Sequence, residues 1–187
     1  MPYAKRSSEI LYRRVEAYID TNYEPEGSSS SWNPFDILKG KILNKIGVPP
    51  ILGSPGQMDA IDALMGMVEE TFAETLLSLI RSKGKNAVDI YTKAGITKQH
   101  FYKIKRNSDY QPTKETAMAF AVALQLTLEE TADLLERAGF ALSKSSKRDL
   151  IVEYFIKERI YDVDEINFNL DSRGFPALTN RRSGKDE

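Results

Sequence analysis

The sequence contains no cysteine, a single histidine and almost no net charge (−1). Without cysteine the chain has no disulfide, no thiolate zinc site and no cysteine nucleophile. The lone His100 excludes metal sites that use several histidines. Acidic pairs such as Asp162/Asp164 and Glu129/Glu130 fit helix N-terminal charges better than a general acid and base. We therefore predict no metal, no cofactor and no catalytic residue, and a protein that is not an enzyme.

Long hydrophobic runs are also absent. No apolar run approaches the roughly 20 residues that cross a bilayer. The first residues, MPYAKRSSEILYRR, lack the apolar segment that secretion requires. These features predict a cytoplasmic protein without a membrane partner. With 41% hydrophobic residues in 187, the chain can bury the core of one or two domains.

Positive charge is concentrated in one segment, although the near-zero net charge argues against nucleic acid binding over the whole surface. Between residues 81 and 107 a single acid, Asp89, stands against eight bases: Arg81, Lys83, Lys85, Lys93, Lys98, Lys103, Lys105 and Arg106. The flanking segments are acidic. Residues 57–80 carry five acids (Asp59, Asp62, Glu69, Glu70, Glu74) and no Lys or Arg, and residues 127–171 also carry more acids than bases.

The spacing of apolar residues predicts an all-α protein, and no segment shows the period of a strand. The predicted helices cover residues 7–19, 34–46, 57–84, 86–94, 97–106, 113–125, 127–138, 146–158 and 162–173. The segment 57–84, opened by a Ser54 to Gln57 capping box, is either one long helix or two abutting helices. Gly84, Gly95 and Gly139 are predicted helix stops. The sequences EPEGSSSS (24–31) and VPPILGSPG (48–56) predict connections.

Two short helices separated by a glycine turn carry the strongest motif. A helix-turn-helix needs such a pair at a steep angle, and Gly95 suits the turn because it has no Cβ to clash. The helices 86–94 and 97–106 flank this glycine. The apolar residues that would pin the second helix are Ile90, Ala94, Ile96, Phe101 and Ile104.

The sequence IYTKAGITKQHFYKIKR (90–106) resembles the lambda-repressor-like family of helix-turn-helix proteins, also called Cro/repressor or xenobiotic-response-element proteins. The resemblance continues through PTKETAMAFAVALQLTLEETADLL (112–135), and residues 72–80 resemble the first helix of that family. It implies a five-helix core, which we place in a domain of residues 57–139. The expected flanks are an N-terminal helical and linker region (1–56), a C-terminal helical extension (140–178) and a disordered tail (179–187). The extension is similar to modules found behind some bacterial macrodomains, but the chain contains no macrodomain.

The resemblance implies a transcriptional regulator that binds double-stranded DNA, in most cases as a homodimer. Its third helix, 97–106, would enter the major groove. We predict base contacts from exposed residues on that helix, with Gln99 suited to adenine and Lys98 to guanine. The remaining predicted contacts there are Thr97, His100, Tyr102 and Lys103. Asn86, Lys105 and Arg106 are expected to hold phosphates.

One residue departs from the family pattern. Tyr91 stands where a small residue is usual, at the crossing of the second and third helices. Its ring must either point outward or open the angle between the helices. The alternative function is therefore a protein-interaction adaptor on the same scaffold, phage- or defence-related, which would bind a partner through the N-terminal or C-terminal helices.

Overall fold

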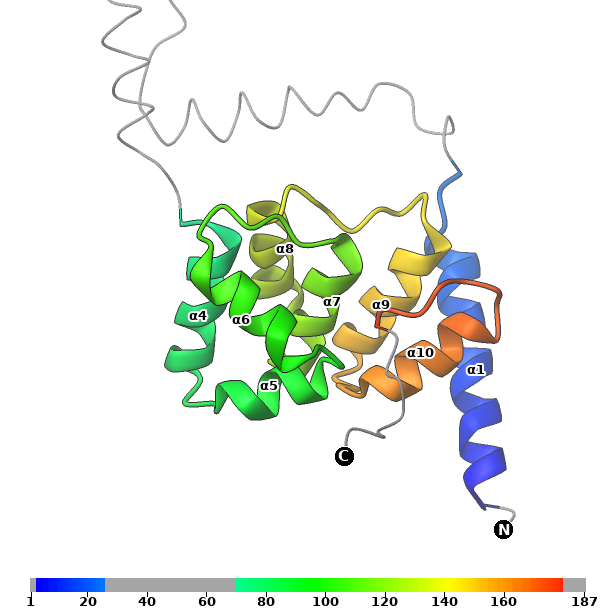
Figure 1. Cartoon of the computed structure of the whole chain (residues 1–187). Helices are drawn as coiled ribbons and strands as arrows, with labels where there is room; N and C mark the ends of the chain where they lie inside the picture. The colour runs from blue at the N-terminus through cyan, green and yellow to red at the C-terminus, as the bar shows by residue number, and fades with distance from the viewer. Residues whose placement is uncertain (1–2, 26–69, 180–187) are drawn as a thin grey trace, which may run out of the picture. The chain divides into compact units, whose positions relative to one another are not determined.

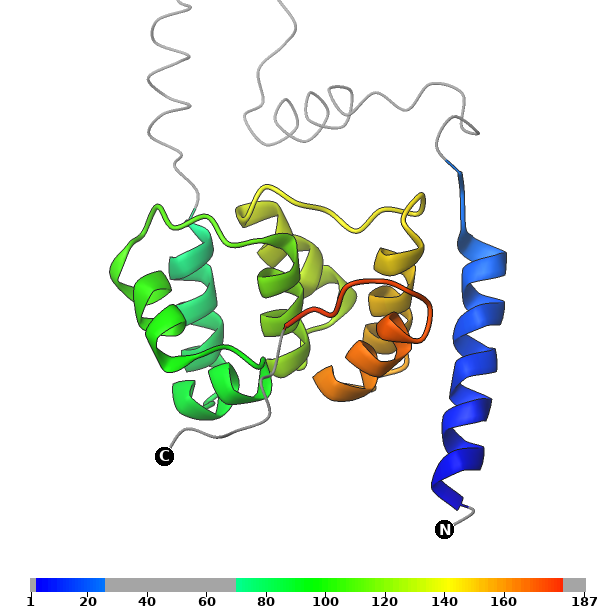
Figure 2. The same cartoon turned by 45° about the vertical axis from the view of Figure 1, so that its right-hand side comes forward.

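The described part of the chain, residues 3–25 and 70–179 of a computed structural model, contains helices and no strand, as the sequence predicted (Figure 1). Figure 2 shows the same helices turned by 45°. The helices are α1 (Tyr3–Asn22), α4 (Phe72–Ser82), α5 (Ala87–Lys93), α6 (Lys98–Arg106), α7 (Lys114–Ala123), α8 (Leu128–Arg137), α9 (Lys147–Lys157) and α10 (Val163–Asp171). None of these described helices is long and apolar enough to cross a membrane. The predicted helix 34–46, the predicted connections from residue 26 to 31 and from 48 to 56, the Ser54 capping box and the tail beyond Thr179 lie outside the described residues.

Side-chain caps begin the helices at the predicted positions. Asn86, Thr97 and Thr113 each accept a hydrogen bond from a backbone N–H in the first turn of α5, α6 and α7. Thr127 and Glu130 form the predicted capping box of α8. Each cap satisfies a backbone donor that has no partner inside its helix. Local chemistry therefore fixes where these helices start.

Of the two alternatives for residues 57–84, the single long helix is wrong, and residues 57–69 lie outside the described part of the chain. Residues 57–84 do not form a single continuous helix, because Glu70 and Thr71 are not helical and α4 begins at Phe72. Thr71 accepts from the backbone of Glu74, and the Glu74 carboxylate accepts from the backbone of Thr71. This Thr-x-x-Glu capping box is present in the sequence and predicts the break.

The helices end partly as predicted. Gly84, Gly95 and Gly139 adopt positive φ values of 60°, 70° and 76° after α4, α5 and α8. Gln125 and Arg159 adopt the same left-handed conformation after α7 and α9, with φ of 57° and 58°. The helix ends predicted at Gln125 and Glu158 lie within two residues of the observed ends, although no glycine marks either stop.

Helix α7 lies at the centre of the core. Its residues from Thr116 to Ala123 are all buried, and it packs against α5, α8 and α10. Phe120 of α7 lies between Phe72 of α4 and Phe101 of α6, with ring centroids 6.4 and 6.3 Å apart. Buried aromatic and aliphatic area of this kind is the main favourable term in folding. Through Phe101 the same core fixes the position of α6.

The C-terminal helices pack directly on this core. Helix α9 contacts α8 and α10, and α10 also contacts α7. Asp149, in the first turn of α9, is almost fully buried, and it accepts hydrogen bonds from Lys114 of α7 and from the backbone of Ser143. Arg148 pairs with Glu115 beside it. Two adjacent ion pairs therefore join the start of α7 to the start of α9.

Helix α1 packs on α9, a helix that lies far from it in the sequence. It is longer than the predicted segment 7–19. Val15 and Ile19 are buried, and the Tyr18 hydroxyl donates to Glu153 of α9 at 2.8 Å. In both views α1 lies beyond α9 and α10, on the side away from α6 (Figures 1 and 2).

Candidate nucleic-acid interface

The turn between α5 and α6 sets the direction of α6. The Ile96 N–H donates to the Tyr91 carbonyl at 2.8 Å, and the Gly95 N–H donates to the Thr92 carbonyl at 3.0 Å. These two bonds form a Schellman motif, in which the residue at Gly95 must be left-handed. The Thr97 hydroxyl then caps α6 by accepting from the His100 N–H at 3.2 Å. The chain therefore changes direction within four residues, and both helix ends are hydrogen-bonded.

The inner face of α6 is anchored in the core. Phe101 and Ile104 are buried. Tyr91 is half-buried, and its ring centroid lies 5.3 Å from that of Phe101. The Tyr91 ring does not point fully outward; it packs between α5 and α6. Because α6 is held by apolar contacts on one side, its opposite face is presented to solvent.

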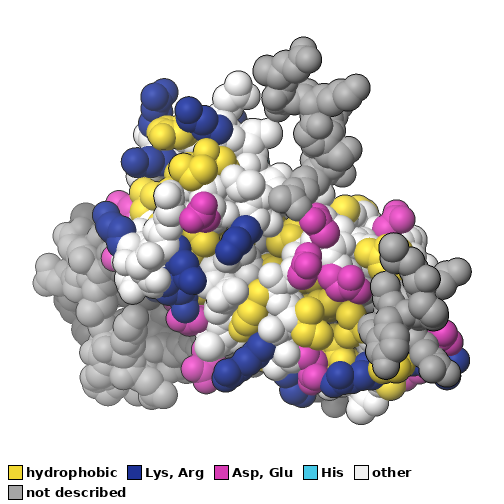
Figure 3. Space-filling view, turned by 90° about the horizontal axis from the view of Figure 1, so that it is seen from below, with side chains coloured by type: hydrophobic (Ala, Val, Ile, Leu, Met, Phe, Trp, Pro, Cys, Tyr) yellow, Lys and Arg dark blue, Asp and Glu magenta, His cyan; other side chains and the backbone are white. Residues whose placement is uncertain are grey.

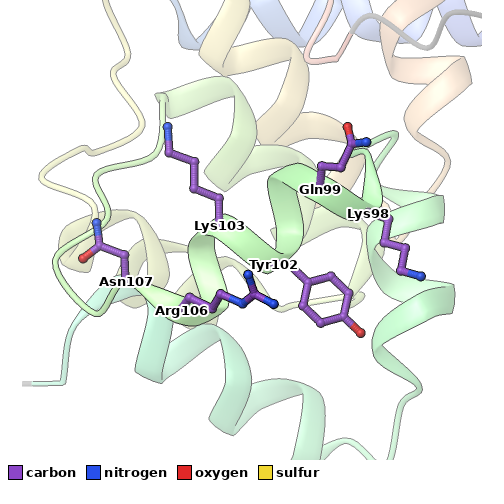
Figure 4. A pocket seen from close by; sticks show the side chains of 6 residues that line it. All are labelled: Lys98, Gln99, Tyr102, Lys103, Arg106 and Asn107. Carbon is purple, nitrogen blue, oxygen red and sulfur yellow. The ribbon is translucent and has the colours of Figure 1, made fainter.

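The outer face of α6 carries two parallel rows of side chains. One row is Lys98, Tyr102 and Arg106, and the other is Gln99, Lys103 and Asn107, each at a spacing of four residues. These six residues line an open hollow that runs between the rows. Figure 4 shows the first row projecting to one side of α6 and the second row to the other. The hollow therefore follows the length of the helix, and both of its walls carry polar or cationic groups.

Cations surround the tyrosine in the first row. The Lys98 Nζ, the Lys105 Nζ and the Arg106 Cζ each lie 6.0 Å from the centre of the Tyr102 ring. Within the described ranges, none of these three cations forms an ion pair with a carboxylate. Figure 3 shows Lys and Arg groups gathered around hydrophobic atoms at the upper left, while acidic groups are spread over both halves of the view. The outer face of α6 is thus positively charged, and no carboxylate among the described residues compensates this charge.

Not all of the basic segment contributes to this face. Lys83 is half-buried and pairs with Glu130 of α8 at 2.9 Å, so it holds α4 against α8. The same contact lowers the pKa of Glu130, chiefly through the hydrogen bond from Lys83. Arg81, Lys85 and Lys93 are exposed. The charge count of the sequence therefore overstates the positive charge available for a ligand.

His100 has a structural role. It is half-buried, so its predicted exposure is wrong, and its Nε2 lies 2.7 Å from the Tyr110 hydroxyl. Burial lowers the pKa of His100, and the positive charge of Lys103 lowers it further. The Lys103 Nζ in turn lies 5.5 Å from the centre of the Tyr110 ring. The contact between His100 and Tyr110 joins α6 to the loop that follows it. Lys103, which belongs to the second row, lies over the same tyrosine ring.

The other predicted residues divide into caps and surface groups. Asn86 and Thr97 are exposed, but their side-chain oxygens are engaged as helix caps. Lys98, Gln99, Tyr102, Lys103, Lys105 and Arg106 are all exposed on α6. Asn107 was missed: it follows the last residue of α6 and lines the hollow. Its spacing of eight residues from Gln99 is the signal that places it on the same row.

In residues 3–25 and 70–179, no group of histidine and carboxylate side chains could hold a metal ion. Comparisons with protein-family models, with curated proteins and with solved structures returned no match.

Proposed function

We propose that this protein binds double-stranded DNA, with α6 in the major groove, and acts as a transcriptional regulator of the lambda-repressor-like helix-turn-helix type. One observation carries the proposal. The outer face of α6 holds Lys98, Lys103, Lys105 and Arg106 without an ion pair in the described part of the chain, while the inner face is fixed by buried residues. A rigid helix with a cationic face is the arrangement that a negatively charged groove receives.

The size of α6 also suits this role. An α-helix with its side chains is about 10–12 Å across, and the major groove is about 12 Å wide. The nine residues of α6 extend about 13 Å along the helix axis. Helix α1 does not cover α6, because α1 lies beyond α9 and α10, on the side of the described helices away from α6. A short, exposed helix of this kind can enter the groove with its whole outer face.

Each row on α6 has a distinct task in this proposal. Gln99 pairs with an adenine edge and Lys98 with a guanine edge, at the start of the helix. Lys105 and Arg106, at the end of the helix, contact phosphates and fix the register. The side-chain oxygen of Asn86 caps α5, so only its amide N–H groups are available to a phosphate. Pairing of two copies on two half-sites would supply the affinity that one such module lacks.

The experiment is a selection of bound duplexes from a random pool at low salt, followed by binding measurements on the enriched sequence. Replacing Lys98 and Gln99 by alanine should remove the preference for the enriched sequence, with about 1–3 kcal/mol lost per base contact. Replacing Lys147 and Lys157 by alanine is the matched control, because both are exposed on α9. Failure of the wild-type protein to retain any duplex at low salt would refute the proposal.

A second function has its own supporting observation. Phe168 on α10 is 55% exposed and Ile10 on α1 is 59% exposed, although both are large apolar side chains. Exposed apolar residues are typical of protein-binding surfaces when they form a patch. An adaptor that binds a partner through α10 would lose that partner when Phe168 is changed to Ser, and one that uses α1 would lose it when Ile10 is changed to Ser. Either adaptor would keep its partner when Lys98 and Gln99 are changed to alanine.

A further inference from the structure

Tyr102 is not explained by the packing of α6. It is 39% exposed, and among the residues of α6 it is the one large hydrophobic side chain on the outer face. Its ring approaches that of the adjacent, buried Phe101 edge-on, with centroids 6.0 Å apart. The other five residues of the two rows are polar or cationic. An aromatic ring there therefore indicates a contact with something outside the described chain.

The position of Tyr102 in its row limits what that contact can be. Lys98 precedes it by one turn and Arg106 follows it by one turn, so a cation lies at each end of the row (Figure 4). When the cations of such a row contact guanines or phosphates, the residue between them faces the base edges. In the major groove these edges present donors, acceptors and a single kind of apolar group, the C5-methyl of thymine.

We propose that Tyr102 recognises a thymine through its C5-methyl group, midway along α6. This inference rests on the DNA-binding function proposed above, and it names the chemistry that α6 selects. In the unbound protein three cations lie 6.0 Å from the ring centre and hold the ring by cation–π attraction. When Lys98, Lys105 and Arg106 turn to the DNA, the exposed surface of the ring supplies the apolar contact. Burial of one methyl group against that surface supplies the discrimination.

The test uses the full chain and the duplex enriched from the random pool. Each thymine is replaced in turn by deoxyuridine, which removes the methyl group and keeps every Watson–Crick hydrogen bond. At one or two positions the wild-type protein should bind about four-fold more weakly, the effect of one buried methyl group. The Tyr102→Phe variant keeps the ring and should show the same loss. The Tyr102→Ala variant lacks the ring and should bind thymine and deoxyuridine duplexes equally.

Three results would overturn this inference and leave the DNA-binding function standing. The first is an enriched site that contains no thymine, and the second is an enriched site where no thymine-to-deoxyuridine change lowers the affinity. The third is a Tyr102→Ala variant whose affinity falls with deoxyuridine as much as that of the wild type. Tighter binding of the single strand than of the duplex would also overturn it, because Tyr102 would then stack on an unpaired base. If no nucleic acid is retained at low salt, the DNA-binding function fails together with this inference. Circular dichroism confirms that both variants are folded.

Discussion

The two ends of the described molecule use their charged residues differently. Around α1, α9 and α10, cations pair with carboxylates on other elements: Arg14 with Glu158, Lys144 with Glu153 and Arg173 with Glu16. On the outer face of α6, the cations surround a tyrosine and have no such partner among the described residues. At the first end these ion pairs hold helices together, and Lys147 and Lys157 lie over the Tyr23 and Tyr18 rings. Charge at the second end remains available to a ligand. The comparison predicts that substitutions at the first end change stability and substitutions at the second end change binding.

The largest effect is expected at the buried pair that joins α7 to α9. Changing Asp149 to alanine removes the acceptor of Lys114 and of the Ser143 N–H; the Asp149 side chain is 3% exposed and that of Lys114 is half-buried. We expect a loss of about 3 kcal/mol in the free energy of unfolding, since one charge of a buried pair is left without its partner. Urea unfolding measures this loss.

The exposed carboxylate of Asp133, which pairs with Arg137 on the same helix, gives the control. Changing it to alanine should cost no more than about 0.5 kcal/mol. Equal losses for Asp149→Ala and Asp133→Ala would contradict the structural role given to the first end of the molecule.

The next effect is at Arg173, which holds α1. Its guanidinium lies 3.7 Å from the centre of the Tyr12 ring and donates to the Tyr12 carbonyl at 2.9 Å and to Glu16 at 3.1 Å. Changing Arg173 to alanine should cost about 2 kcal/mol, because it removes several charge-assisted hydrogen bonds. Hydrogen exchange should become faster in α1 and stay unchanged in α6. Exchange that accelerates equally in both helices would show that the two ends are not independent.

A smaller effect at Thr97 separates stability from binding at the second end. Changing Thr97 to alanine removes the cap of α6 and should cost about 1 kcal/mol. Changing it to aspartate keeps a capping oxygen but places an acid beside Lys98. The aspartate variant should therefore be as stable as the wild type and bind DNA more weakly. A Thr97→Asp variant with undiminished DNA binding would argue against the groove contact of α6.

The smallest effect is the pH dependence at His100. Because burial lowers its pKa in the folded state, the unfolded chain takes up the proton first as the pH falls below 6.5. Stability should therefore decrease as the pH falls from 6.5 towards the lower folded-state pKa. Thermal unfolding of the His100→Gln variant should show a weaker decrease over this range. An identical pH profile in the variant would assign the decrease to other groups.

The sequence predicted features that depend on adjacent residues and missed contacts between residues that are far apart in the chain. Caps such as Thr97 and Thr127 and the stop at Gly95 depend on a few adjacent residues, so the pattern locates them. The buried partner of Asp149 is Lys114, 35 residues away, and no local pattern connects the two. The same limit explains His100, whose burial depends on Tyr110 in the following loop. The exposed residues of α6 were predictable, but their division into two rows with a hollow between them needed the helix boundaries.

The salt dependence of DNA binding tests the central claim most directly. Lys105 and Arg106 should each neutralise a phosphate, so changing both to alanine should lower the slope of log affinity against log salt by about 1.8, at about 0.9 per phosphate contact. The matched change of Lys147 and Lys157 on α9 should leave the slope as in the wild type. Equal slopes for the wild type and the Lys105/Arg106 variant, or no binding of any duplex in dilute buffer, would contradict the account.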